Sequence, residues 1–169
     1  MPQPKDHAVD RNLIETVLRH IPGFRGYLEK EYRRESDELQ REWLADKLQR
    51  SKRSVDELAR QLVDAAEVDA LPPIDRLRVR LDRLLGRIRG AMQGYSGFFD
   101  LVRVDESLLE EVYAHDASLD ELVDGFTQSA EQLPGKRDQV QAAVDELLGR
   151  IEEIERRWDK REDMLKGLG

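Results

Sequence analysis

The sequence predicts an all-α protein: an elongated antiparallel helical bundle with coiled-coil-like hairpins and one long first helix. Apolar residues recur every three or four positions along most of the chain, which is the period of one helix face. Charged residues make up 38% of the chain and fill the positions between them, as in long amphipathic helices. No segment alternates like a strand, and all six prolines fall outside the predicted helix interiors. Short turns between such helices favour antiparallel neighbours.

The chain is expected to begin with a flexible N-terminus, residues 1–9, followed by a single helical domain, residues 10–169. Asp10 can cap a short helix over 10–20, whose small apolar face consists of Leu13, Ile14, Val17 and Leu18. Pro22 disfavours helix at the residue before it, and two nearby glycines permit a sharp turn. We therefore expect an elbow over 21–27.

A long helix is predicted over 26–70. Its buried stripe is expected to consist of Leu28, Tyr32, Leu39, Trp43, Leu44, Leu48, Val55, Leu58, Leu62 and Ala66. Acid–base pairs four residues apart, such as Asp37/Arg41 and Asp56/Arg60, are expected on its other faces, where each contributes about 0.2–0.5 kcal/mol. The tetrad beginning at Ser54 has capping-box spacing, so a break near Ser54 is the alternative to one continuous helix.

Three further helices are predicted over 73–94, 105–133 and 136–166. The Leu71-Pro72-Pro73 segment ends the long helix, and Pro73 suits the first turn of the next helix. A second capping-box tetrad begins at Ser118, which makes a kink or restart of the 105–133 helix plausible there.

Gly86, Gly90 and Gly94 recur every fourth residue and share one helix face. Because each glycine inside a helix costs about 1 kcal/mol relative to alanine, three together indicate that another helix approaches closely. Packing within the monomer is the favoured interpretation, and a dimer contact is the alternative. A phosphate cradle over 94–97 is disfavoured because it lacks the following Lys-Ser/Thr and the preceding strand.

Two segments share the pattern Gly-aromatic-x-Gly-aromatic, one beginning at Gly23 and the other at Gly94. Their aromatic residues are predicted to plug one end of the bundle. The alternative is a pocket for a protein partner. The candidate residues are Phe24, Tyr27, Tyr95, Phe98 and Phe99.

The net charge of −8 is unevenly distributed. The 104–135 segment contains nine acidic residues and no lysine or arginine, whereas the 73–95 segment contains six arginines and two aspartates. We expect the acidic helix, or another subunit, to neutralise the arginines. Nucleic-acid binding is not expected, because no aromatic residues interleave with the arginines and the whole chain is acidic.

Catalytic chemistry finds little support. The chain has no cysteine, and none of its three histidines follows a glutamate by three residues, as a di-metal carboxylate site would require. Glu111 and His115 stand four residues apart and could share a metal, but a surface contact is the favoured interpretation. We expect no cofactor, no metal and no small-molecule substrate.

The segments Ile-Pro-Gly-Phe-Arg-Gly-Tyr, beginning at Ile21, and Gly-Tyr-Ser-Gly-Phe-Phe-Asp, beginning at Gly94, resemble those of small uncharacterised prokaryotic helical proteins. The resemblance covers about residues 21–106. It implies no activity, only that the two elbows are the characteristic parts.

We therefore expect a cytoplasmic, non-catalytic protein-interaction or scaffold module that binds itself or a protein partner. The N-terminal residues lack the apolar core of a signal peptide, and no stretch approaches the roughly 20 apolar residues of a membrane span. The alternative is a peripheral membrane-associated stress protein that uses the helix over 10–20 as its anchor.

Overall fold

The computed structural model describes residues 20–27, 30–90 and 106–165. The described residues form four α-helices and four short 3₁₀ turns, so the all-α prediction is confirmed. The helices are α2 (Arg33–Asp64), α3 (Leu71–Gly90), α5 (Glu106–Glu131) and α6 (Val140–Leu165). The 3₁₀ turns are η1 (Lys30–Tyr32), η2 (Val68–Ala70), η4 (Leu133–Gly135) and η5 (Arg137–Gln139). The helix predicted over 10–20 lies outside the described residues.

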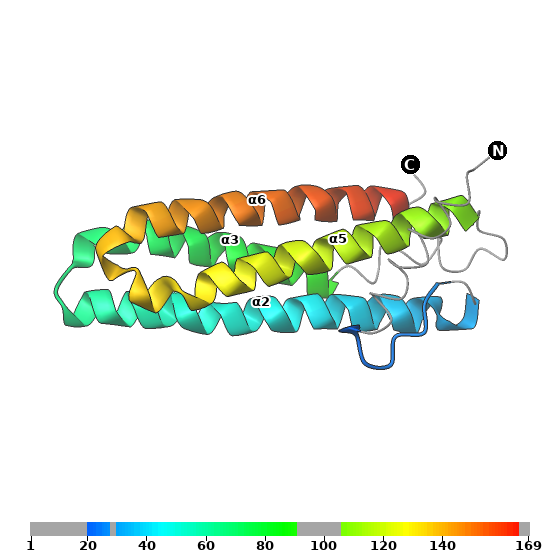
Figure 1. Ribbon diagram of the computed structural model, residues 1–169, viewed down its shortest axis with the longest axis horizontal. Helices are drawn as coiled ribbons and strands as arrows, with labels where there is room; N and C mark the ends of the chain where they lie inside the picture. The colour runs from blue at the N-terminus through cyan, green and yellow to red at the C-terminus, as the bar shows by residue number, and fades with distance from the viewer. Residues whose placement is uncertain (1–19, 28–29, 91–105, 166–169) are drawn as a thin grey trace.

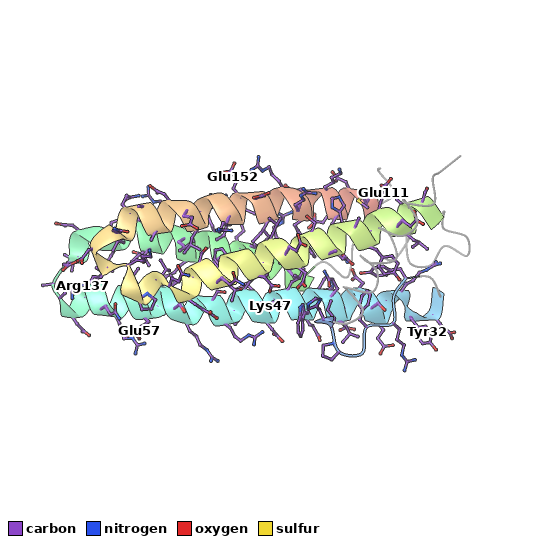
Figure 2. All side chains as sticks on the ribbon, in the orientation of Figure 1. Tyr32, Lys47, Glu57, Glu111, Arg137 and Glu152 are labelled. Atoms are coloured by element: carbon purple, nitrogen blue, oxygen red, sulfur yellow. The ribbon has the colours of Figure 1, made fainter. Side chains whose placement is uncertain are left out.

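The four helices form an elongated bundle of two antiparallel hairpins (Figure 1). Helix α2 packs against α3 and α5, and α6 packs against α5 and α3, so α2 and α6 are diagonally opposed. Both hairpin turns lie at the same end of the bundle, where Arg137 Nη2 is 2.6 Å from Glu67 Oε1 (Figures 1 and 2). Neighbouring helices from different hairpins, α2 with α5 and α3 with α6, therefore run parallel.

The long first helix is shorter than predicted at both ends. It begins at Arg33 rather than at residue 26, because a 3₁₀ turn over Lys30–Tyr32 precedes it. Instead of extending to residue 70, α2 ends at Asp64, because Ala66 adopts a left-handed φ of 60°. The amides of Ala66 and Glu67 donate to the carbonyls of Val63 and Leu62 at 3.0 and 2.8 Å, which is the Schellman pattern of helix termination. Ala66, expected in the buried stripe, is consequently exposed.

The other helix boundaries differ from prediction by a few residues. Helix α3 begins at Leu71, so Pro72 and Pro73 lie within its first turn, where the missing amide protons leave no bond unmade. Helix α6 begins at Val140 rather than at residue 136, because a 3₁₀ turn precedes it. Helices α2 and α5 continue through Ser54 and Ser118, so neither capping-box tetrad interrupts a helix.

The core occupies the axis of the bundle, and the predicted apolar stripe of α2 contributes Leu44, Leu48, Val55, Leu58 and Leu62 to it. Leu44, Leu48, Leu58 and Leu62 are completely buried there. A second apolar cluster lies toward the end opposite the hairpin turns, and it consists of Ile21, Phe24, Tyr27, Leu109, Val112, Tyr113, Ala117, Met164 and Leu165. No helix among the described residues is long and apolar enough to cross a membrane.

Candidate functional site

The first elbow is an internal part of the bundle rather than an open pocket. Phe24 and Tyr27 are buried, and their rings contact Tyr113 of α5 at centroid distances of 6.4 and 5.1 Å. Gly26 has a φ of +91°, and a Cβ at this position would overlap the Tyr113 hydroxyl. The prediction that the aromatic residues plug the bundle is confirmed for Phe24 and Tyr27. Their burial argues against the alternative of a partner pocket at these two residues.

Arg161 of α6 joins the elbow to α2 and α5 through a buried polar cluster. Its Nε donates to Asp116 Oδ1 of α5 at 2.7 Å, and its Nη2 donates to Asp37 Oδ1 of α2 at 2.7 Å. The Tyr27 hydroxyl donates to the other carboxylate oxygen of Asp116. All four side chains are at most 1% exposed. The cluster therefore joins three helices and the elbow. Removing one partner from such a buried ion pair typically destabilises a protein by about 3–5 kcal/mol.

Burial determines the protonation of this cluster. Burial and the Asp116 carboxylate raise the pKa of the Tyr27 phenol well above its usual value. Burial also raises the pKa of Asp116, while Arg161 opposes that shift. Burial lowers the pKa of Arg161, but Asp116 and Asp37 outweigh this effect and hold it well above the usual value. The cluster therefore contains a neutral phenol and a permanent cation, without solvent access.

Arg41 completes the cluster and connects it to α3. Its Nε donates to Asp37 Oδ2 at 2.9 Å, so the predicted Asp37/Arg41 pair is confirmed but is buried rather than exposed. Its Nη1 donates to the carbonyls of Ile88 and Arg89 at 3.2 and 3.1 Å. Carbonyl groups toward the C-terminal end of a helix carry partial negative charge and therefore favour a cation such as Arg41.

The glycine face of α3 points outward. Gly86 and Gly90 are exposed, and no atom lies within 4 Å of a Cβ built at either residue, apart from those of the helix itself. The prediction of close packing within the monomer is therefore wrong for these two glycines. The inward face of α3 carries the leucines and isoleucines of the core, and the glycines lie on the opposite side. Gly94 lies outside the described residues.

Three arginines of α3 pair with α2 and α6 rather than with the acidic α5. Arg78 Nη2 is 2.7 Å from Asp56 of α2, and Arg80 Nη2 is 2.7 Å from Glu155 of α6. Arg87 pairs with Asp159 and Glu162 of α6. The expected pairing within the chain is thus confirmed for these three arginines. The expectation that the acidic helix supplies the partners is wrong, because α5 lies diagonally opposite α3.

The carboxylates of α5 have other partners. Lys47 of α2, labelled in Figure 2, lies 2.9 Å from Asp120 and 2.6 Å from Asp124. These ion pairs join α2 and α5 on the side of the bundle away from α3. The acidic helix is therefore neutralised in part by its own neighbours.

The outer surface of α3 is the strongest candidate for binding a macromolecule. We define the α3 face by residues that share the outward side of this helix: Asp75, Arg76, Val79, Asp82, Arg83 and Gly86. Val79, at its centre, is 58% exposed. Beside it, a groove of about 490 Å³ runs between α3 and α6, lined by Asp75, Arg76, Val79, Arg80, Asp145 and Leu148. Val79 and Leu148 give this groove an apolar wall.

Two further sequence predictions concern the second elbow and a possible metal site. Tyr95, Phe98 and Phe99 of the second elbow lie outside the described residues. The Glu111/His115 pair is not a good metal site, because Arg157 and Lys160 line the same cavity. Within the described part of the chain, no group of three or more residues is arranged to hold a metal ion.

The buried cluster was missed because ordinary surface pairs look the same in sequence. Asp37 and Arg41 gave a signal, since they stand four residues apart, but that spacing also describes exposed pairs. The signal for Arg161 is weaker. This residue follows Trp158 by three positions and so continues the apolar side of α6. Nothing local connects it with Asp116 or Tyr27.

No family model, curated protein or solved structure matches the chain.

Proposed function

We propose that the protein is a non-catalytic interaction module that associates with a second copy of itself through the α3 face. The observation that carries this proposal is the order of charges around Val79. Asp75 and Asp82 form one edge of the face, and Arg76 and Arg83 form the other. Val79 and Gly86 lie between the edges, seven residues apart and therefore two helical turns apart.

This order is self-complementary in one orientation. A two-fold axis parallel to α3 places the acidic edge of one copy against the basic edge of its partner, at the same height along the helix. An antiparallel pair would instead oppose like edges, arginine against arginine and aspartate against aspartate. The charges therefore favour a parallel pair of bundles.

The partners of these charges within the chain fit the same proposal. Among the described residues, Arg76 and Arg83 have no ion pair, unlike Arg78, Arg80 and Arg87 of the same helix. Asp82 is 2.7 Å from the half-buried Lys52, and Asp75 is 3.6 Å from Arg78. Exposed pairs contribute only about 0–1 kcal/mol, so these contacts leave both aspartates able to bind a partner's arginine.

The affinity is expected to be modest. Contact between Val79 and its symmetry mate supplies the apolar part, and Gly86 lets the two backbones approach. An interface of a single helix from each copy belongs to the small class, below about 1,200 Å² in total, which is typical of transient association. The module would therefore assemble when it is concentrated locally.

Charge reversal provides a sharp test. Arg76→Asp makes both edges acidic at one level, and Asp75→Arg makes both edges basic there. Each variant alone should self-associate more weakly than the wild type, because like charges meet on both sides of the symmetric pair. An equimolar mixture should recover association, because each acidic edge then meets a basic one. Sedimentation velocity over a concentration series measures all four cases.

Arg53→Asp is the matched control, because Arg53 is exposed on α2 and has no ion pair among the described residues. It changes the net charge as Arg76→Asp does, yet it should leave association unchanged. A wild type that stays monomeric at every concentration would contradict the proposal. So would a mixture that associates no better than its separate components.

A further inference from the structure

A shallow cavity of about 310 Å³ lies between α5 and α6, away from the α3 face. It is lined by Glu111, Ala114 and His115 of α5 and by Arg157 and Lys160 of α6. Glu111, which is labelled in Figure 2, lies near the N-terminal end of α5. Because Arg157 and Lys160 are three residues apart, they project from the same side of α6.

The cavity has an excess of positive charge. Arg157 and Lys160 are exposed, and neither makes an ion pair within the described part of the chain. Glu111 is the single carboxylate in the lining. Such an unneutralised pair of cations stands out in a chain whose net charge is −8.

His115 forms the buried wall of the cavity and is 7% exposed. Burial lowers the pKa of its imidazole, and Lys160, Arg157 and Arg161 of α6 lower it further, whereas Glu111 of its own helix acts in the opposite direction. The imidazole is therefore neutral at neutral pH, and one ring nitrogen can donate a hydrogen bond while the other accepts one.

We propose that this cavity binds a phosphate group through Arg157, Lys160 and the imidazole of His115. A guanidinium matches two phosphate oxygens with a pair of parallel hydrogen bonds, and an ammonium adds a compact positive charge. The imidazole supplies a third donor from the buried side. Glu111 at the rim disfavours larger anions that would approach it. This site is independent of the α3 face and of self-association.

The direct test is the titration of His115 in the full-length chain. Histidine ring signals are followed by ¹H–¹³C NMR against pH, in sodium phosphate and in sodium chloride of equal ionic strength. A bound phosphate dianion should raise the pKa of His115 relative to chloride, while His7 and His20 serve as references. The His115→Gln variant assigns the signal.

Two double variants separate the site from general charge effects. Arg157→Gln with Lys160→Gln should weaken phosphate binding about tenfold or more, because two charge-assisted contacts are lost. Arg53→Gln with Arg156→Gln removes the same charge from exposed positions outside the cavity lining and should bind as the wild type does. An equal response of both double variants would overturn the proposal.

A second arm identifies the source of the phosphate. Phosphatidylcholine vesicles containing phosphatidic acid present a phosphate monoester, and vesicles containing phosphatidylglycerol present a phosphodiester instead. A His115 response to phosphatidic acid alone identifies a lipid headgroup, and a response to inorganic phosphate identifies a soluble ligand. The absence of a response in both arms would overturn the proposal.

Discussion

At the scale of single residues, Tyr27 is the most constrained side chain of the elbow. It is completely buried, its amide donates to the Tyr113 hydroxyl at 2.6 Å, and its hydroxyl donates to Asp116. Arg33 Nε donates to its carbonyl at 2.6 Å. One residue thus links the elbow to α2 and α5 through both backbone and side chain.

Tyr27→Phe should lower the free energy of unfolding by about 1.5–3 kcal/mol, because a buried carboxylate loses a donor that no water replaces. Urea denaturation followed by circular dichroism measures this loss. Tyr32→Phe is the control, since Tyr32 is only half-buried, and it should change stability by no more than about 0.5 kcal/mol. Equal effects of the two substitutions would show that the Tyr27–Asp116 bond contributes little.

His115 gives the molecule a specific dependence on pH. Its pKa is lowered in the folded chain by burial and by the cations Lys160, Arg157 and Arg161. The folded state therefore binds a proton less readily than the unfolded state, so the stabilisation exists above the ordinary histidine pKa and is lost as the pH falls through the folded value. Between pH 7 and pH 5, the wild type should lose more stability than His115→Gln. Thermal unfolding of both chains in chloride buffers measures the difference, and parallel curves would contradict it.

At the scale of elements, the end of α2 shows what local sequence leaves undetermined. The apolar spacing continues smoothly through Ala66, so the pattern predicted helix to residue 70. Helix termination here depends on an alanine in the left-handed region, where glycine is the usual residue. The apolar spacing does not reveal that conformation. The predicted boundary was therefore placed just before Pro72 and Pro73, which commonly end a helix.

Ala66→Gly should therefore stabilise the protein by about 1 kcal/mol, because glycine adopts a positive φ without the steric cost that alanine incurs. Chemical denaturation measures the change. Ala114→Gly, at an exposed position inside α5, should destabilise by a similar amount, since glycine is unfavourable in a helix interior. A loss of stability at both positions would contradict the assigned end of α2.

A substitution on the glycine face of α3 should affect the stability of the monomer and its self-association in opposite directions. Because nothing lies within 4 Å of a Cβ at Gly86, Gly86→Leu should raise the stability of the monomer by about 0.8–1 kcal/mol through helix propensity. The same substitution should weaken self-association, because a leucine separates the two copies of α3. Differential scanning calorimetry and sedimentation velocity measure the two effects.

Gly149 of α6 provides the matched control, since it too is an exposed helical glycine with open space around its Cβ position. Gly149→Leu should stabilise the chain and leave association unchanged. If Gly86→Leu behaves in the same way as Gly149→Leu, the α3 face is not an interface. If Gly86→Leu destabilises the monomer, the outward orientation of the glycines is wrong.

At the scale of the whole molecule, the helix periodicity predicted the bundle and most of its core, because burial follows spacing along one helix. It did not predict which helices are neighbours. The expectation that the acidic helix neutralises the arginines failed because two short-turned hairpins can be placed side by side in more than one way. Their observed arrangement puts α6, not α5, beside α3.

The candidate sites could not be predicted in full for the same reason, because they too depend on which helices are neighbours. The outward direction of Gly86 follows from the position of the apolar stripe on α3, but its exposure depends on where α2 and α6 lie. Asp37, Asp116 and Arg161 come from three helices, and only the assembled bundle brings them together. The proposed parallel association of whole bundles likewise depends on which sides of α3 its neighbours leave uncovered.

Cysteine cross-linking at the α3 face tests parallel self-association directly, since the chain contains no cysteine of its own. Val79→Cys and Gly86→Cys are prepared separately and oxidised mildly, with Val63→Cys as a control at an exposed valine outside the α3 face. A disulfide requires Cα atoms about 4.4–6.8 Å apart. The parallel pair predicts cross-linked dimers at both 79 and 86, well above the control. Cross-linking at only one of the two positions would contradict the parallel arrangement, and cross-linking at neither would contradict self-association through α3.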